Sequence, residues 1–309
     1  MKIDTTAILG AGAVGGYFIW GLSEKLKENL WVIADGNRKE RLKSEGIDIN
    51  GEKFKLNIRT PKEARGADLL LISTKYGALN DILDDVETIV DDHTIVLSLL
   101  NGIDSEEIIG KRIGMEHMVY SMMKISSERK GDRITFNGDV TLGLFYGEAG
   151  QKDPSERMKA IAGLLDGTAI HYHMCEDIIR EIWCKFALNI SCNQPQAILG
   201  CGAGAYDDSV YAAHLCQKLK DEVAAVAMAK GIDIGTSDIE GTRRSASAKA
   251  ARYSTLQDLD AGRHTEVDMF AGTVVRMGKE LGIPTPYNEF TYHVIKALEE
   301  KNDGKFDYG

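Results

Sequence analysis

The sequence predicts an α/β domain with a parallel sheet over residues 1–175, followed by an all-helical domain over residues 176–309. Two observations lead to this prediction. In the first half, short and nearly continuous apolar runs alternate with helical stretches, which is typical of buried parallel strands joined by crossover helices. From about Glu176 onward, the pattern changes to one helix after another. A chain of 309 residues is long enough for two such hydrophobic cores.

The composition argues against several classes of partner. The formal net charge of -10 disfavours nucleic acid or an anionic membrane as the main partner. We find no apolar run of the roughly 18 to 20 residues that a membrane span needs, and the N-terminus enters a strand too early for a signal peptide. The five cysteines include no C-x-x-C pair, which fits a reducing environment. We therefore expect a cytoplasmic protein.

The first strand leads directly into a glycine-rich turn. The apolar segment Thr5–Leu9 is followed by the pattern G-x-G-x-x-G, formed by Gly10, Ala11, Gly12, Ala13, Val14 and Gly15. The first glycine of this motif permits a tight turn, the second lets the backbone approach a pyrophosphate, and the third allows close packing of helix and strand. A helix to about Lys27 follows, with its N-terminus directed at the phosphates. This context predicts a Rossmann-type domain that binds a dinucleotide.

The second strand, Leu30–Ala34, ends at Asp35, which lies 20 residues after Gly15. A carboxylate at this position accepts hydrogen bonds from the ribose hydroxyls of NAD and repels a 2′-phosphate. Arg38 and Lys39 follow closely and could instead hold that phosphate, or they are solvated loop charges. The sequence leaves the choice between NADH and NADPH open, and Asp35 raises the expectation of NADH.

Later strands place polar residues at one edge of the sheet. Strands are predicted over Lys55–Arg59 (in a small excursion), Ala67–Thr74 and Thr94–Leu100, with a helix over Asp81–Val90. Lys75 and Asn101 directly follow two of these strands. Because the carboxyl ends of parallel strands line the ligand crevice, both residues are candidates for the cofactor site. The alternatives are a solvated lysine and an Asn-Gly turn.

The first half closes with short strands. They are predicted over Met118–Ile125, Arg133–Asn137, Val140–Phe145 and His171–Cys175, with a helix over Pro154–Leu165. His171 and His173 share one face of the last strand, but a second pair of ligands does not follow, so we expect no metal site.

The second half is a series of helices. They are predicted over Asp177–Asn193 with a continuation past Pro195, over Ser209–Lys230, over Arg243–Arg252, and from Pro286 to about Glu300. Another helix is expected to begin at Thr265, as an N-cap whose capping box is closed by Asp268, and to end at Gly282. Glu266 would lie in its first turn, where the helix dipole favours a carboxylate.

Lys185, Asn189 and Asn193 recur every fourth residue in the first of these helices. A helix turns by about 100° per residue, so the three side chains share one face. An ammonium group and two amides in a row suit a small polar substrate that carries a carbonyl. The alternative is the wet face of an ordinary amphipathic helix. Ser254 and Glu266 have similar alternatives, as a turn hydroxyl and a dipole-matched surface carboxylate.

In these motifs the sequence resembles the ketopantoate reductase (2-dehydropantoate 2-reductase) family, over nearly its whole length. The matching motifs are Gly10-Ala-Gly12-Ala-Val-Gly15, Thr74-Lys75, Asn101-Gly102, Trp183-x-Lys185-x-x-x-Asn189-x-x-x-Asn193, Ser254, and Gly262-Arg263-x-Thr265-Glu266-Val-Asp268. The glycine motif is generic, whereas the row from Lys185 together with Ser254 and Glu266 is specific. The resemblance implies a Rossmann domain plus a helical domain, the plan of 6-phosphogluconate dehydrogenase, with the active site between them.

The resemblance also implies an activity and residue roles. The family reduces 2-dehydropantoate to (R)-pantoate with NADPH in pantothenate biosynthesis. Lys185 would be the general acid, and Glu266 would bind the substrate hydroxyl. Lys75 and Asn101 would stand where cofactor and substrate meet. The remaining substrate-binding residues would be Asn189, Asn193 and Ser254.

Two departures from the family pattern bear on these expectations. Asp35 replaces a residue that is usually basic, and Gln194 separates Asn193 from Pro195 where many members read Asn-Pro. Reduction of another 2-oxo acid therefore stays open, as does a non-catalytic NAD(P)-sensing protein. The helical half could also offer a face for a homodimer, although no apolar stripe marks one.

Overall fold

The computed structural model describes residues 2–235, 249–306 and 308 of the chain. It divides into two compact units, an α/β unit (Met1–Ile178) and a helical unit (Ile179–Gly309). The domain boundary predicted between residues 175 and 176 stays a prediction, because compactness alone does not define a folding domain. Most of the helix predicted over Arg243–Arg252 lies outside the described residues. None of the helices in the described ranges combines the length and apolar character needed to span a bilayer.

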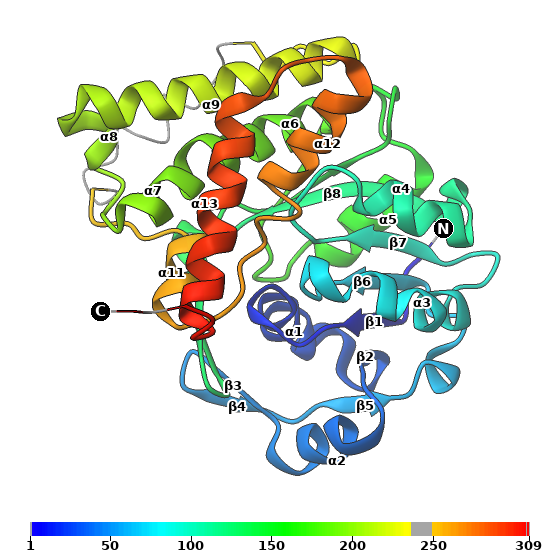
Figure 1. Cartoon of the computed structure of the whole chain (residues 1–309). Coiled ribbons are helices and arrows are strands. Elements are labelled where there is room, and N and C mark those ends of the chain that lie inside the picture. The colour runs from blue at the N-terminus through cyan, green and yellow to red at the C-terminus, as the bar shows by residue number, and fades with distance from the viewer. Residues whose placement is uncertain (1, 236–248, 307, 309) are drawn as a thin grey trace. The chain divides into compact units, whose positions relative to one another are not determined.

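Eight strands in the described part of the α/β unit form the main sheet, in the order β12-β11-β8-β7-β6-β1-β2-β5 (Figure 1). They are β1 (Thr6–Leu9), β2 (Leu30–Ile33), β5 (Asn57–Arg59), β6 (Leu69–Ile72), β7 (Ile95–Ser98), β8 (Met118–Lys124), β11 (Gly143–Gly147) and β12 (Tyr172–Met174). The strands from β8 to β5 are all parallel, which confirms the predicted sheet, whereas β11 runs antiparallel to β8.

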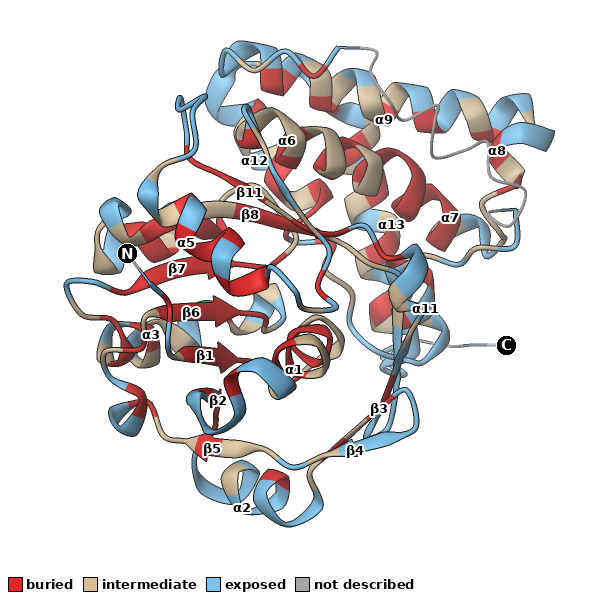
Figure 2. Cartoon of the chain, turned by 180° about the vertical axis from the view of Figure 1, so that it is seen from behind, coloured by how far each residue is buried: buried red, intermediate tan, exposed pale blue. Residues whose placement is uncertain are grey.

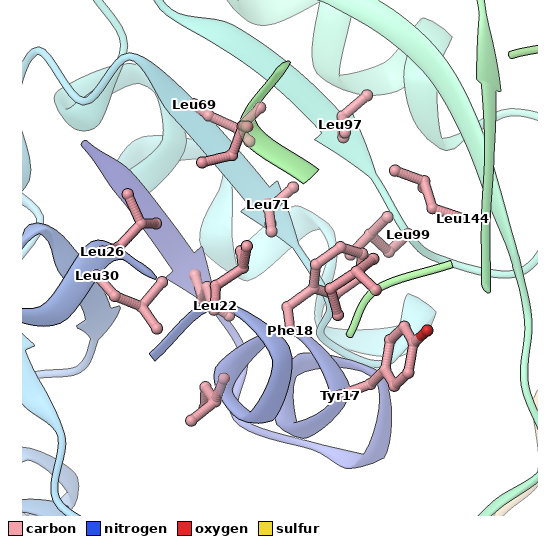
Figure 3. Close-up of a cluster of buried hydrophobic side chains, with 14 of the residues drawn as sticks. Tyr17, Phe18, Leu22, Leu26, Leu30, Leu69, Leu71, Leu97, Leu99 and Leu144 are labelled. Atoms are coloured by element: carbon pink, nitrogen blue, oxygen red, sulfur yellow. The ribbon is translucent and has the colours of Figure 1, made fainter. Parts of the chain in front are cut away.

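Helices cover both faces of this sheet. They are α1 (Ala13–Leu26), α2 (Gly36–Glu45), α3 (Leu83–Ile89), α4 (Ser105–Ile113) and α5 (Glu156–Leu165). Side chains alternate along each strand, so Leu69 and Leu71 face the core cluster that includes Phe18 of α1 (Figure 3). Leu70 and Ile72 face a second cluster with α3 and α4. Burial on both faces explains the continuous apolar runs, and Figure 2 shows β1, β6 and β7 as buried throughout.

A smaller sheet corrects part of the sequence prediction. Its four strands in the described residues are ordered β4 (Glu52–Phe54), β3 (Ile47–Ile49), β10 (Arg133–Phe136) and β9 (Ser127–Lys130). The expected excursion strand over Lys55–Arg59 is instead β5, which pairs with β2 in the main sheet. Residues Gly138–Val140 form a short 3₁₀ turn, so the strand predicted from Val140 begins only at Gly143.

The described part of the helical unit differs from the prediction in several boundaries and contains two short helices that were not predicted, Ala205–Asp208 and Ser254–Asp260. Its helices are α6 (Ile178–Leu188), α7 (Gln194–Leu199), α8 (Ala205–Asp208), α9 (Val210–Ala229), α11 (Ser254–Asp260), α12 (Ala271–Leu281) and α13 (Pro286–Asn302). Within this unit α13, red in Figure 1, packs against α12, α9 and α7. The helix predicted over Asp177–Asn193 ends in a π-turn over Asn189–Asn193 that joins α6 to α7. In an unbroken α-helix the ring of Pro195 would clash with the Ser191 carbonyl, and a wider turn is the expected response.

Candidate active site

The glycine-rich turn of the α/β unit leaves no room for side chains at two positions. Gly10 has a φ of 111°, and a Cβ there would lie 2.7 Å from the backbone of Ser73. A Cβ on Gly15 would lie 2.0 Å from the carbonyl oxygen of Gly10. The Ser73 hydroxyl donates to that same Gly10 carbonyl at 2.6 Å. Both glycines are therefore required by the close approach of β1, α1 and the end of β6.

The second glycine has a different environment. A Cβ on Gly12 would meet only the Ser73 carbonyl oxygen, at 3.9 Å, so the space above it is open. Gly12 is the N-cap of α1, where no side chain caps the helix and the first turn carries no acidic residue. The first N–H groups of α1 are thus left for an anion, and this arrangement fits the pyrophosphate of a dinucleotide. Ala11, Ala13 and Val14 complete the predicted loop.

Asp35 lies exposed at the carboxyl end of β2, as the N-cap residue of α2. Of the two basic residues that follow it, Lys39 forms an ion pair with Glu63, with Nζ and Oε2 2.9 Å apart. Hydrogen bonds from Thr60 and from Lys39 lower the pKa of Glu63 to about 2. Lys39 is therefore already paired with a carboxylate that stays ionised.

Arg38 belongs to a cluster of like charges. Partial desolvation, together with Arg129 and Arg41, lowers the pKa of the Arg38 guanidinium. Arg129, from β9, donates to the carbonyl of Ala11 in the glycine-rich turn at 3.4 Å. The guanidinium groups of Arg38, Arg41 and Arg129 thus form one cluster, which reaches the glycine-rich turn through Arg129. Sequence reasoning missed Arg129, because β9 is a short polar strand without an apolar pattern. It also missed Arg41, which lies on α2 three residues after Arg38.

Lys75 and Asn101 lie at the carboxyl ends of β6 and β7, as predicted. Lys75 is exposed and Asn101 is half-buried, in a loop where Gly102 has a φ of 105°. Between β6 and Lys75, the Thr74 hydroxyl is buried and has no hydrogen-bond partner among the described residues. An orphaned buried hydroxyl beside the glycine-rich turn fits a site that a ligand completes.

In the helical unit, the row of Lys185, Asn189 and Asn193 is interrupted by the π-turn. Lys185 lies on α6 and is half-buried, whereas Asn189 and Asn193 begin and end the widened turn. Asn193 is only 4% exposed. The prediction of one uniform α-helical face is therefore wrong in detail, and π-turns of this kind occur often at functional sites.

The structure brings Asn193 and Ser254 together although they are 61 residues apart in sequence. The Asn193 side-chain amide donates to the Ser254 hydroxyl at 3.1 Å. Its carbonyl oxygen accepts a hydrogen bond from the Thr255 N–H at 3.2 Å. Ser254 is the first residue of α11 and is exposed. Two predicted substrate-binding residues thus form one polar unit.

Glu266 does not lie in the first turn of a helix, which corrects the sequence prediction. Glu266 is a bend, residues 267–270 form a turn, and α12 begins only at Ala271. The predicted capping box is absent from this described segment because its members have other partners. The Thr265 hydroxyl donates to Glu299, and the Asp268 carboxylate accepts from Tyr292.

Two further polar residues near these positions were missed. Gln194 is fully buried, and neither atom of its side-chain amide has a hydrogen-bond partner among the described residues. Glu299, on α13, is only 2% exposed and accepts two hydrogen bonds from Thr265. The departure from the Asn-Pro pattern marks Gln194 in the sequence. Glu299 carries no such mark, because its partner is 34 residues away.

The two histidines of the last strand have other contacts. His171 places Nδ1 2.7 Å from the Thr141 carbonyl oxygen, and His173 stacks on Phe145. Within the described ranges there is no group of three or more His, Cys, Asp or Glu residues that could hold a metal ion.

The parallel sheet, the open glycine-rich turn and the uncapped α1 together define a dinucleotide-binding protein of the Rossmann type. Comparison with known proteins gives the family. The family model "Ketopantoate reductase PanE/ApbA" matches residues 6–147, and the corresponding C-terminal model matches residues 177–299. The chain belongs to the ketopantoate reductase family and is an oxidoreductase.

Curated relatives carry the name 2-dehydropantoate 2-reductase. One from Streptococcus pyogenes serotype M3 is 30% identical over 305 residues, covering 94% of this chain and 97% of the relative. One from Pyrococcus horikoshii is 29% identical over 307 residues, covering 96% and 98%. The similarity therefore extends over both units.

Solved structures share the fold. A PanE/ApbA family ketopantoate reductase from Ralstonia eutropha superposes with a TM-score of 0.83 at 23% identity, covering 97% of this chain and 99% of that one. D-mandelate dehydrogenase with NADH and anilino(oxo)acetate gives 0.84 at 25% identity, with the same coverage. A ketopantoate reductase from Staphylococcus aureus that is described as dimeric gives 0.80 at 18% identity, covering 96% and 99%.

Proposed function

We propose that this protein reduces 2-dehydropantoate to (R)-pantoate. The observation that carries the proposal is the hydrogen bond to Ser254 from Asn193, which ends the π-turn that directly follows α6, the helix of Lys185. A sensor of nucleotides needs neither this polar pair nor the lysine beside it. Membership of an oxidoreductase family argues against the sensor alternative as well.

The proposed roles follow from the chemistry of the side chains. A bound dihydronicotinamide supplies the hydride. The Lys185 ammonium holds the negative charge that develops on the carbonyl oxygen and donates a proton to it. Asn189, Asn193 and Ser254 offer donors to the polar groups of the substrate, and Glu266 accepts a hydrogen bond from its hydroxyl. Lys75, Asn101 and Thr74 contribute at the end of the sheet.

We propose NADPH as the preferred cofactor. Three guanidinium groups, those of Arg38, Arg41 and Arg129, outweigh the single charge of Asp35, and arginine suits a 2′-phosphate. Lys39 contributes less because Glu63 pairs with it. The loss of absorbance at the reduced nicotinamide band, measured with 2-dehydropantoate and either NADPH or NADH, tests both proposals. Absence of turnover despite cofactor binding would remove the assignment of this substrate.

A second candidate is the reduction of another 2-oxo acid. It is favoured by Gln194, a buried amide beside Asn193 whose polar atoms are unpaired in the described structure. It is also favoured by the likeness to D-mandelate dehydrogenase, whose structure holds a 2-oxo acid analogue. A panel that compares 2-dehydropantoate with phenylglyoxylate and aliphatic 2-oxo acids discriminates between them. A kcat/KM highest for an acid other than 2-dehydropantoate would establish this second candidate. A homodimer stays a prediction, which light scattering tests.

A further inference from the structure

The segment that carries Glu266 is held at both ends by one face of α13. Thr265, directly before Glu266, donates through its N–H and its hydroxyl to Oε1 of Glu299, each at 2.6 Å. Asp268, two residues after it, accepts from the hydroxyl of Tyr292 at 2.8 Å and from Lys296 at 3.1 Å. Positions 292, 296 and 299 are spaced by four and three residues, so they lie on the same face of the helix.

The carboxylate of Glu299 is buried, and removing a charged group from water has a large desolvation cost. Its side chain is 1% exposed, and its second oxygen lies 3.0 Å from Nζ of Lys296 in an ion pair. Replacing a buried ion pair by well-packed apolar residues is often neutral or stabilising, so stability alone does not explain it. The Glu299 carboxylate also fixes the orientation of Thr265, because the N–H and the hydroxyl of Thr265 both donate to the same oxygen atom, Oε1.

The hydroxyl of Thr265 also fixes the turn that follows. It accepts a hydrogen bond from the N–H of Val267 at 3.2 Å while it donates to Glu299. The carbonyl of Glu266 in turn accepts from the N–H groups of Met269 and Phe270. The backbone of Glu266 is thus held on both sides, by the contacts of Thr265 before it and by the turn that its own carbonyl closes.

We propose that Glu299 is a positioning residue that holds Thr265 so that the carboxylate of Glu266 faces the hydroxyl group of a 2-oxo acid substrate. This inference rests on the proposed function. It adds a residue from the last helix to the substrate site, without direct contact between that residue and the substrate.

Variants at both partners test this role. In Glu299→Gln and Thr265→Val, we expect kcat/KM for the 2-oxo acid to fall about 10- to 100-fold, since a displaced group loses its alignment. Thr265→Ser keeps the hydroxyl and should restore activity to within about twofold of the wild type. The matched control is Glu289→Gln on the same helix, whose carboxylate pairs with Lys279 at 3.2 Å instead. Cofactor affinity should be unchanged in all four variants.

A double variant separates positioning from general loss of structure. If Glu299 acts through Glu266, then adding Glu299→Gln to Glu266→Ala should cost little further activity. A further loss as large as that of Glu299→Gln alone would overturn the proposal. So would wild-type kcat/KM in both Glu299→Gln and Thr265→Val. If Glu299→Gln does not fold, as judged by circular dichroism, Thr265→Val decides.

Amide hydrogen exchange keeps the inference testable apart from turnover. The N–H groups of Thr265 and Val267 should exchange faster in Glu299→Gln than in the wild type or in Glu289→Gln. Unchanged exchange would show that Glu299 does not hold the segment. A wild-type protein that reduces no 2-oxo acid would instead remove the proposed function, and the exchange data would still decide whether Glu299 holds Thr265.

Discussion

The two units build their candidate site residues in opposite ways. In the α/β unit, the glycine-rich turn acts through its backbone, because Gly10 and Gly15 have no room for side chains and α1 is uncapped. In the helical unit, the site depends on side chains that hold other side chains, as in the pair of Asn193 and Ser254. The α/β unit is therefore sensitive at a few glycines, whereas the helical unit is sensitive at partners far away in sequence.

This difference teaches that cofactor binding and action on the substrate should be separable by mutation. The first is expected to depend on main-chain geometry close to β1, and the second on side-chain contacts within the helical unit, such as those of Asn193 with Ser254 and of Thr265 with Glu299. Changes in one unit should leave the property of the other intact.

The largest effect is expected at Lys185. In Lys185→Ala, kcat with the 2-oxo acid should fall about 10²- to 10⁴-fold, as is typical for the loss of a general acid. Cofactor affinity, measured by the fluorescence of bound NADPH, should stay close to that of the wild type. A variant with nearly normal kcat would remove the role assigned to Lys185, and a loss of cofactor binding would break the separation.

The second-largest effect is expected at Glu106, a buried carboxylate of the α/β unit that can be compared with Glu299 of the helical unit. Glu106 of α4 is 3% exposed and accepts hydrogen bonds from the Ser105 hydroxyl at 2.8 Å and from the Ser121 N–H at 3.4 Å. Glu299 of the helical unit has a lysine partner, whereas these two partners of Glu106 are neutral. Burial raises the pKa of Glu106 from 4.5 to about 7.

The raised pKa of Glu106 makes the stability of the fold depend on pH. The protonated form is favoured in the folded state, so this contribution is fully present below about pH 4.5 and is lost as the pH rises to about 7. Glu106→Gln, which stays neutral, should be as stable as the wild type near pH 5 and more stable at pH 8, by on the order of 3 kcal/mol. Urea unfolding at both pH values measures the difference. An equal difference at both would contradict the assignment.

A smaller effect is expected at the glycine-rich turn. In Gly15→Ala, the new methyl group would lie 2.0 Å from the Gly10 carbonyl oxygen, so the turn must shift. We expect a loss of about 1–3 kcal/mol, seen as 10- to 100-fold weaker cofactor binding in a titration. The control is Gly77→Ala, because a Cβ there meets nothing within 4 Å. Equal cofactor affinities in the two variants would contradict the backbone role of Gly15.

The smallest effect is expected at Asp35. Asp35→Arg should raise the ratio of kcat/KM for NADPH to that for NADH by roughly tenfold, because a repelling charge becomes an attracting one. Arg38→Ala should lower the same ratio. Ratios that stay constant in both variants would remove these residues from the ribose site. The preference for 2-oxo acids should not change in either variant.

The sequence was more informative about the α/β unit than about the helical unit. The glycine motif and the buried strands are local patterns, so the main sheet and the positions of Asp35, Lys75 and Asn101 could be predicted. The strand β9 could not, since Ser127–Lys130 is polar and its partners lie elsewhere in the chain. The capping box at Thr265 failed because the carboxylate of Asp268 is bound instead by Tyr292 and Lys296, which lie 24 and 28 residues later. Local rules cannot include such distant partners.

The π-turn changes how position along the chain translates into direction in space. In a regular α-helix, counting residues fixes the direction of every side chain, at about 100° per step. The wider turn over Asn189–Asn193 interrupts this count, so the residue spacing in α6 does not predict the directions of the side chains in α7. In α13 the count is not interrupted, so a residue inserted before Lys296 would rotate Lys296 and Glu299 away from the segment they hold.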